Sequence, residues 1–136
     1  MHKTVNDIIV KKGRQKISVV TSYDYAMTTL CDQVDILLVG DSAGMVMLGY
    51  ENTAPVTMDQ MCMFTEAVSN GRQNALIVAD LPNKSYENEI DAVSNSERLI
   101  NAGADAVKLE GRLPDVIRAI VKAGIPVMGH LGLVPQ

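Results

Sequence analysis

The feature of this sequence that most constrains its fold is an alternation of short apolar runs with helical patterns. The runs are nearly continuous in apolar residues, which is typical of strands covered on both faces, as in a parallel sheet. They occupy residues 17–20, 36–39, 75–79, 106–109 and 125–128. Between the runs, apolar residues recur at helical spacing. This order predicts an α/β fold built from consecutive strand–helix units.

The helical segments are predicted from their apolar spacing and from signals at their ends. A short leading helix is expected over residues 5–11, with Thr4 as its N-cap. Thr57 and Gln60 have the spacing of a capping box at the start of a helix that runs to about residue 68. Pro114 and Gly124 indicate the start and end of the last helix. Two further helices are expected around residues 27–34 and 90–100.

The number of units leaves two architectures open. A closed (β/α)8 barrel needs eight units and typically ~250 residues, whereas this chain of 136 residues has four units and one further strand. It is either a small open sheet of five strands or the first half of a barrel, and periodicity alone does not choose between them. No linker, charge block or low-complexity segment divides the sequence, so residues 1–136 are expected to form a single domain.

Composition and charge argue against several classes of protein. The 12 basic and 16 acidic residues give a net charge of −4 without a basic stripe, so nucleic-acid binding is not expected. No uncharged apolar run approaches the ~20 residues of a membrane span, and no secretory signal is apparent, so we expect a cytoplasmic protein without membrane contact. Cys31 and Cys62 lie on apolar helix faces and are interpreted as buried, reduced thiols.

Polar and ionisable side chains recur where four successive predicted strands end. In parallel α/β proteins, functional groups gather outside the carboxyl ends of the strands. Any one such Asp would more often be a helix cap or a turn residue, but the recurrence at consecutive strands predicts a site. The residues are Asp41 and Ser42 after the second run, Asp80 after the third, Lys108 and Glu110 at the end of the fourth, and His130 after the fifth.

The residue types in this set favour a hard divalent cation. The carboxylates of Asp41 and Asp80 would suit Mg²⁺, which is commonly held by one or two carboxylates together with substrate and waters. A spacing of two residues places Lys108 and Glu110 on one face of their strand. The segment 40–44 (GDSAG) lacks the Lys-Ser/Thr ending of a P-loop and the spacing of a dinucleotide fingerprint, so it is not a nucleotide signal.

Seven short motifs, in their order and spacing, resemble those of the ketopantoate hydroxymethyltransferase family. The resemblance runs from about residue 4 to the last residue and covers about the first half of the family's length. Seven motifs in register are specific, although any one of them alone would not be. The motifs are residues 21–25 (TSYDY), 39–45 (VGDSAGM), 48–50 (LGY), 55–57 (PVT), 79–82 (ADLP), 107–111 (VKLEG) and 129–133 (GHLGL).

The resemblance implies the N-terminal half of a (β/α)8 TIM barrel, with the leading helix and about the first five strands. It implies transfer of a hydroxymethyl group from the co-substrate 5,10-methylenetetrahydrofolate to 3-methyl-2-oxobutanoate, giving 2-dehydropantoate in the pathway to pantothenate and coenzyme A. The implied cofactor is Mg²⁺. The metal ligands would fall on Asp41 and Asp80, with Glu110 close to the metal's water shell, and Lys108 and Glu110 would be catalytic. The 2-oxo acid contacts would fall on Tyr23, Asp41, Ser42, Asp80, Lys108 and His130.

The sequence departs from the family pattern at three points. Asn83 and Lys84 stand where the family usually has an aromatic residue and a glycine, and Phe64 stands where many members carry His. The family's general base is a Glu on a later strand, so no residue here inherits that role, and we expect this chain alone to be poorly active or inactive.

Two other functions stay open, and so does the question of what covers the sheet edges. The chain could be a catalytically incomplete fragment that acts only as a folded or assembling module. It could also be a related Mg²⁺-dependent barrel enzyme that acts on 2-oxo acids or phosphoenolpyruvate. Five strands cannot close into a barrel, so both edges should be covered by another chain, by a continuation of this one or by self-association. A homo-oligomer is the expected assembly.

Overall fold

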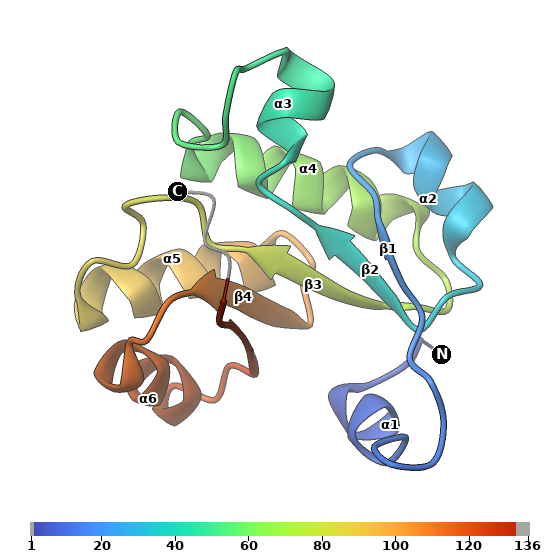
Figure 1. Ribbon diagram of the computed structural model, residues 1–136. Coiled ribbons are helices and arrows are strands. Elements are labelled where there is room, and N and C mark those ends of the chain that lie inside the picture. The colour runs from blue at the N-terminus through green and yellow to red at the C-terminus, as the bar shows by residue number, and fades with distance from the viewer. Residues whose placement is uncertain (1, 133–136) are drawn as a thin grey trace.

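A five-stranded parallel sheet forms the centre of the molecule. The computed structural model describes residues 2–132. The strands lie in the order β1-β2-β3-β4-β5, each parallel to the next (Figure 1). This sequential order excludes the doubly wound alternatives and is the order of strands in a barrel wall. The strands are β1 (Val19–Thr21), β2 (Ile36–Val39), β3 (Leu76–Asp80), β4 (Ala106–Glu110) and β5 (Val127–His130).

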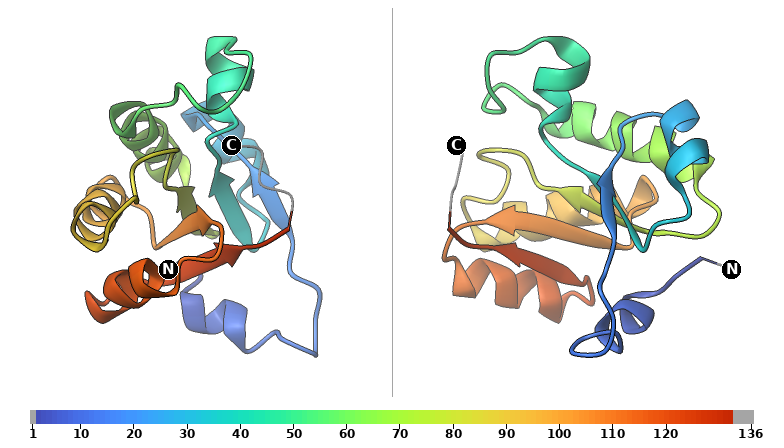
Figure 2. Two further views of the ribbon diagram at one scale, coloured as in Figure 1. Left: turned by 60° about the vertical axis from the view of Figure 1, so that its left-hand side comes forward. Right: turned by 45° about the vertical axis from the view of Figure 1, so that its right-hand side comes forward.

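Helices α2, α4, α5 and α6 form a layer on one face of this sheet, and α1 lies apart from them (Figures 1 and 2). Neighbouring helices of the layer pack against each other and against the strands beneath them. None of the helices that the structure describes is long and apolar enough to span a lipid bilayer. The helices are α1 (Val5–Ile9), α2 (Tyr25–Cys31), α3 (Ala43–Leu48), α4 (Met58–Gly71), α5 (Glu89–Asn101) and α6 (Pro114–Lys122).

Alternate residues of β3 face two different apolar clusters, because successive side chains of a strand point to opposite faces. Ile77 and Ala79 belong to the main core beneath the helical layer. Leu76 and Val78 belong to a smaller cluster on the other face, which Val5 and Ile8 of α1 help to cover. The leading helix therefore packs on the face of the sheet that the outer helices leave open.

The predicted helix starts are confirmed by their caps. Thr57 accepts a hydrogen bond from the backbone N–H of Gln60, whose side chain accepts one from the backbone N–H of Thr57. Thr4 and Asp7 form the same reciprocal arrangement at α1, which ends at Ile9 rather than at residue 11. The last helix begins at Pro114, as expected.

Two strands begin two residues further along the chain than the apolar runs indicated, and β3 is shifted by one residue. The first begins at Val19 rather than at residue 17, and the N–H and hydroxyl of Ser18 bind the carboxylate of Asp35, the residue before β2. The fifth spans Val127–His130 rather than 125–128. This shift makes His130 the last residue of a strand instead of a residue that follows one.

Two further expectations need correction. Helix α3 was not predicted, since its exposed apolar residues show no amphipathic pattern, with Met45, Val46 and Met47 each between 45% and 65% exposed. Cys31 and Cys62 are free thiols, as expected, but both are half-buried rather than buried. Each packs against the rim of the main core and keeps part of its surface in solvent.

Strands β1 and β5 are the two edges of the described sheet, as predicted. The exposed fraction of Val19 on β1 is 48%, and that of Leu131, just after β5, is 72%. The unpaired backbone groups of an edge strand are a template for pairing with another strand. Both edges therefore leave backbone and apolar side chains available to a further structural unit.

Candidate functional site

The last residues of three neighbouring strands bring charged side chains to one end of the sheet. Asp80 ends β3, Glu110 ends β4 and His130 ends β5. The strand register pairs Asp80 with Lys108, and Glu110 with His130. Side chains two residues apart on a strand point to the same face. Val78 and Ala106, two residues before Asp80 and Lys108, belong to the smaller apolar cluster, so Asp80 and Lys108 lie on the face that the outer helices leave open.

These four side chains form a continuous series of contacts. Nζ of Lys108 lies 2.9 Å from Oδ1 of Asp80 and 3.9 Å from Oε1 of Glu110. Oε1 of Glu110 lies 2.8 Å from Nδ1 of His130. The side chains of Asp80, Glu110 and Lys108 are between 9% and 14% exposed, whereas His130 is 36% exposed. The series therefore runs from a buried ion pair to an imidazole that solvent reaches.

The turn after β2 brings the backbone of a second acidic residue against Asp80. The backbone N–H of Asp41 donates to Oδ2 of Asp80 over 3.2 Å, and Asp41 is itself buried. Gly40 allows this close approach, since a Cβ there would lie 2.8 Å from Oγ of Ser42 and 3.6 Å from Oδ2 of Asp80. A side chain at this position would therefore displace the Ser42 hydroxyl of the same turn, whereas its distance to Asp80 of β3 would be an ordinary contact.

Two hydroxyl groups lie next to this turn. Oη of Tyr23 is 2.7 Å from Oγ of Ser42. The Tyr23 ring meets the ring of Phe64 edge-on, with centroids 6.5 Å apart and planes at 66°. Ser42 is the N-cap residue of α3 but makes no side-chain capping bond. Its hydroxyl is instead held by Tyr23, which the buried Phe64 of α4 supports from behind.

The site carries more acidic than basic groups. The carboxylates of Asp80 and Glu110 flank the ammonium of Lys108, and a third acidic residue, Asp41, contacts Asp80 through its backbone. Burial raises the pKa of the Asp80 carboxyl above its usual range, although the adjacent Lys108 ammonium and the Asp41 N–H act in the opposite direction. Oε2 of Glu110 is buried and has no hydrogen-bond partner among the described residues. A buried acceptor left unpaired is unfavourable, so the site is suited to receive a cation or a hydrogen-bond donor.

The donor set fits a magnesium-type ion but is not a ready-made metal cage. Within residues 2–132, no three His, Cys, Asp or Glu side chains converge on one point as a metal site would require. Mg²⁺ does not need such a cage, since one or two carboxylates complemented by waters and substrate commonly hold it. Asp41 and Asp80 supply hard oxygen donors, and Glu110 has an acceptor oxygen to spare.

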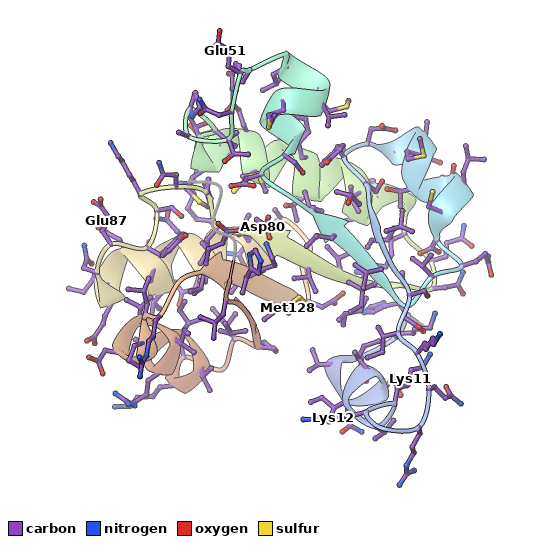
Figure 3. The ribbon with its side chains drawn as sticks, in the orientation of Figure 1. Lys11, Lys12, Glu51, Asp80, Glu87 and Met128 are labelled. Carbon is purple, nitrogen blue, oxygen red and sulfur yellow. The ribbon has the colours of Figure 1, made fainter. Side chains whose placement is uncertain are left out.

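All seven side chains that the sequence indicated lie at the carboxyl end of the sheet. They fall into two groups, Tyr23 with Ser42 on the β1–β2 side, and Asp80, Lys108, Glu110 and His130 on the β3–β5 side, with Asp41 between them. Asp80 belongs to β3 itself and binds Lys108, so it is not a helix cap. Figure 3 shows Asp80 at this end of the sheet and Lys11 and Lys12 beside α1 at the opposite end.

Sequence reasoning missed one residue near these groups. Tyr86, on the loop between β3 and α5, is 8% exposed. Burial raises the pKa of its phenol, a hydrogen bond from the Glu110 backbone lowers it, and the charges of Glu110, Asp41 and Asp80 raise it further. The available signal was an aromatic residue in the loop that follows a site strand, in a chain with only four Tyr and one Phe.

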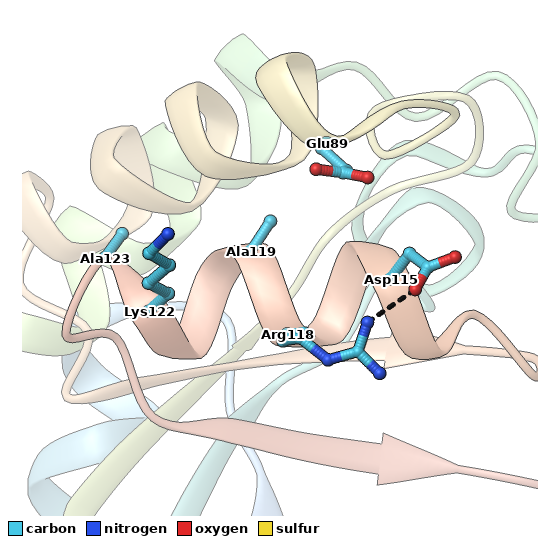
Figure 4. A pocket seen from close by; sticks show the side chains of 6 residues that line it. All are labelled: Glu89, Asp115, Arg118, Ala119, Lys122 and Ala123. Atoms are coloured by element: carbon cyan, nitrogen blue, oxygen red, sulfur yellow. Dashed lines mark hydrogen bonds and ion pairs between the residues drawn. The ribbon is translucent and has the colours of Figure 1, made fainter.

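A separate groove lies on the outer layer between α5 and α6 (Figure 4). It encloses about 430 Å³, and Asp115 and Arg118 form an ion pair of 2.6 Å on its rim. None of the strand-end residues lines it. Its lining residues are Glu89, Asp115, Arg118, Ala119, Lys122 and Ala123.

Comparison with known families gives a match over nearly the whole chain. The sequence model of a family described as Ketopantoate hydroxymethyltransferase matches residues 2–136. A 3-methyl-2-oxobutanoate hydroxymethyltransferase of Nitrosopumilus maritimus (strain SCM1) is 67% identical over 142 aligned positions, which cover 100% of this chain and 51% of that protein. The protein of the same description from Cenarchaeum symbiosum (strain A) is 60% identical, over 92% of this chain and 49% of its own. The chain thus spans about half the length of the curated relatives it matches.

Solved structures show the same arrangement of elements at low sequence identity. A phosphonopyruvate hydrolase complexed with oxalate and Mg²⁺ superposes with a TM-score of 0.75 at 13% identity, over 93% of this chain and 52% of that one. A 2,3-dimethylmalate lyase, described as a member of the PEP mutase/isocitrate lyase superfamily, superposes with a TM-score of 0.71 at 18% identity, over 95% of this chain and 51% of that one. These likenesses concern the fold alone. The expected fold, the N-terminal half of a TIM-barrel architecture, is confirmed.

Proposed function

This chain belongs to the ketopantoate hydroxymethyltransferase family, and we propose that its strand ends form the 2-oxo acid and metal-binding part of a 3-methyl-2-oxobutanoate hydroxymethyltransferase. The proposed reaction transfers a hydroxymethyl group from 5,10-methylenetetrahydrofolate to 3-methyl-2-oxobutanoate and yields 2-dehydropantoate. The observation that carries this proposal is the Asp80–Lys108 pair at the carboxyl end of the sheet, with Asp41 on one side and Glu110 on the other. A cytoplasmic location is part of the same proposal.

The carboxylates of Asp41 and Asp80 would hold Mg²⁺ in this site. Oε2 of Glu110, buried without a partner among the described residues, would accept hydrogen bonds from the water around the ion. When bound, the ion supplies a Lewis acid for the carboxylate and 2-oxo oxygens of the substrate, which stabilises an enolate. Its charge would also balance the excess of carboxylates over ammonium groups.

The other side chains would bind and orient the 2-oxo acid. Lys108 is held by Asp80 on one side and attracted by Glu110 on the other. Its ammonium would stabilise the negative charge that develops on the 2-oxo oxygen. The hydroxyls of Ser42 and Tyr23 are paired over 2.7 Å, so one donates to the other, and the proton of the accepting hydroxyl would be donated to the substrate carboxylate. His130 engages Oε1 of Glu110 and thereby fixes the direction of its other oxygen.

Loss of the proton from C3 of the substrate requires a base, and we assign that role to no residue of this chain. The chain spans about half of its relatives' length. A second candidate function stands beside the first. In this second proposal, the 136 residues retain the side chains that bind substrate and metal, do not catalyse the reaction, and act as a folded or assembling module. The unpaired edges β1 and β5 support self-association, and a homo-oligomer remains our proposal for the assembly.

Calorimetric titration with Mg²⁺ and then with 3-methyl-2-oxobutanoate tests this function. We expect the wild-type chain to bind both, and Asp41→Asn to weaken Mg²⁺ binding at least about tenfold, as loss of a direct carboxylate ligand should. Asp115→Asn is a matched control, since that carboxylate lies on the outer groove and should leave the affinity unchanged. Equal Mg²⁺ affinity in wild type and Asp41→Asn would remove Asp41 from the site. Preferential binding of phosphoenolpyruvate would favour a related barrel enzyme instead.

A further inference from the structure

One face of α4 holds two tyrosine side chains. Gln60 and Phe64 are four residues apart on this helix, so their side chains lie next to each other on one face of it. Nε2 of Gln60 donates to Oη of Tyr50 over 2.8 Å. The ring of Phe64 meets the ring of Tyr23, which lies on the loop between β1 and α2. The same helix therefore supports two phenols that come from different loops.

Both phenols contact the segment that follows β2. Oη of Tyr23 is 2.7 Å from Oγ of Ser42. The Tyr50 ring lies close to Gly44, where an added Cβ would come within 3.0 Å of Cδ2 of the ring, and the Tyr50 backbone N–H donates to the Gly44 carbonyl over 2.9 Å. The Ser42 side chain makes no capping bond to α3, so the partner that directs its hydroxyl is Tyr23.

The contact between Phe64 and Tyr23 favours one orientation of the phenol. The ring centroids are 6.5 Å apart and the planes meet at 66°, which is an edge-to-face pair. Such a pair is attractive because the positive edge of one ring meets the negative face of the other. Phe64 is 5% exposed and belongs to the main core, whereas Tyr23 is only partly buried against that core. The ring that the core holds in place thus orients the ring at its rim.

We infer that Phe64 is a positioning residue for the 2-oxo acid, which acts through Tyr23 by holding its hydroxyl against that of Ser42. Two hydroxyls that share a hydrogen bond have one O–H left to donate between them. With the phenol fixed, that proton has a fixed direction, as recognition of a substrate carboxylate requires. This inference rests on the proposed function, since it concerns how this chain would bind 3-methyl-2-oxobutanoate.

Crystal structures of the wild-type chain and of Phe64→Leu test the positioning without metal or substrate. Leucine keeps a buried apolar side chain, so the variant should fold, but it removes the ring edge. We expect the wild-type distance from Oη of Tyr23 to Oγ of Ser42 to stay near 2.7 Å, and the variant distance to exceed about 3.5 Å, beyond hydrogen-bond range. A hydroxyl pair that is unchanged in Phe64→Leu would overturn the inference, whether or not the chain binds a 2-oxo acid.

Calorimetry of 3-methyl-2-oxobutanoate binding with Mg²⁺ present then tests the role of the contact. Phe64→Leu should weaken substrate binding about fivefold, in line with the value of an edge-to-face pair. Val68→Ala is the matched control, because Val68 is also fully buried on α4 but lies one turn further toward the start of β3. It should lower stability and leave substrate affinity unchanged. An equal loss of affinity in both variants would overturn the inference.

Two further variants distinguish an effect through Tyr23 from a general effect on the core. In the Tyr23→Phe background, Phe64→Leu should weaken binding no further, because the hydroxyl that Phe64 positions is already absent. Phe64→His restores an aromatic ring and should bind the substrate within about twofold of wild type.

Independent losses from Tyr23→Phe and Phe64→Leu would overturn the inference, and so would a Phe64→His variant as weak as Phe64→Leu. If the wild-type chain binds no 2-oxo acid at all, the proposed function fails. The crystallographic distance between the Tyr23 and Ser42 hydroxyls then still decides whether Phe64 positions them.

Discussion

The ammonium of Lys108 lies 2.9 Å from Oδ1 of Asp80, and the two residues are register partners on adjacent strands. Both side chains are largely buried, at 14% and 9% exposure. Removing two charges from water is unfavourable, and their mutual attraction recovers that cost only with good geometry. A charge pair at this depth is therefore better explained by the chemistry of the strand ends than by the stability of the sheet.

Replacing Lys108 with Met should destabilise the fold. The buried Asp80 carboxylate would lose its cation, and we expect the free energy of unfolding at neutral pH to fall by about 3 kcal/mol. Urea denaturation measures this change. The double variant Asp80→Asn/Lys108→Met should recover part of the loss, since a neutral amide has less need of a cation. Unchanged stability in Lys108→Met would show that Asp80 does not depend on this pair.

Asp35 should make stability depend on acid pH. Hydrogen bonds from Lys11 and from the backbone of Ser18 lower the pKa of Asp35 to about 2. The folded-state pKa is thus below the unfolded value, and the unfolded chain binds the extra proton as the pH falls from about 4 to about 2. The contribution of Asp35, roughly 1–2 kcal/mol, is present above that window and is lost on going down through it.

Urea denaturation of wild type and Asp35→Asn across this range provides the measurement. The stability difference between the two proteins should be full above about pH 4 and should shrink toward pH 2. Asp115→Asn, which alters an exposed pair on α6, should show no comparable pH dependence. A difference that stays constant from neutral pH to pH 2 would contradict the assignment.

The main strands and the candidate site could be predicted because both follow from local patterns. Apolar runs located all five strands, and the rule that functional groups gather at the carboxyl ends selected Asp41, Asp80 and Lys108. The alternation of side chains along a strand placed Lys108 and Glu110 on one face, where the structure has them 3.9 Å apart. These inferences needed only the repeat of side-chain direction, which is two residues along a strand and 3.6 residues along a helix.

What could not be predicted depends on contacts between distant segments. Just before the first strand, Ser18 binds Asp35, 17 residues away. Helix α3 has no amphipathic pattern to reveal it, and its ends are set by Ser42 and by the left-handed Gly49. Tyr86 is buried in the β3–α5 loop, which Asn95 of α5 holds by a hydrogen bond to the carbonyl of Ser85, ten residues away. None of these contacts leaves a periodic trace in the sequence.

The open sheet edges should make the chain associate with itself. Val19 of β1 is 48% exposed beside unpaired backbone groups, and burial of such an edge favours association. We expect sedimentation equilibrium to detect oligomers, and Val19→Lys to shift the population toward monomer because a charged edge resists pairing. Ile90→Lys, an exposed position on α5 away from both edges, is the control. A wild-type chain that is monomeric at all concentrations would contradict this expectation.

Deuterium exchange at C3 of 3-methyl-2-oxobutanoate should be slow with this chain. The exchange reports proton transfer without requiring methylenetetrahydrofolate. Lys108 and a bound cation would polarise the 2-oxo group, but removal of the C3 proton also needs a positioned base, and general-base catalysis is typically worth ~10²–10⁴ in rate. Water that enters a half-open site would weaken each electrostatic contact further.

The comparison that decides this point is with a full-length relative, measured with Mg²⁺ and the same substrate. We expect the 136-residue chain to exchange at least ~10²-fold more slowly, while retaining substrate binding that Lys108→Met weakens. Binding without exchange is the pattern of a site that polarises its substrate and lacks a base. Exchange at the rate of the full-length relative would mean that a base lies within these 136 residues, and the half-exposed His130, joined to Glu110 at the end of β5, would be the first candidate to mutate.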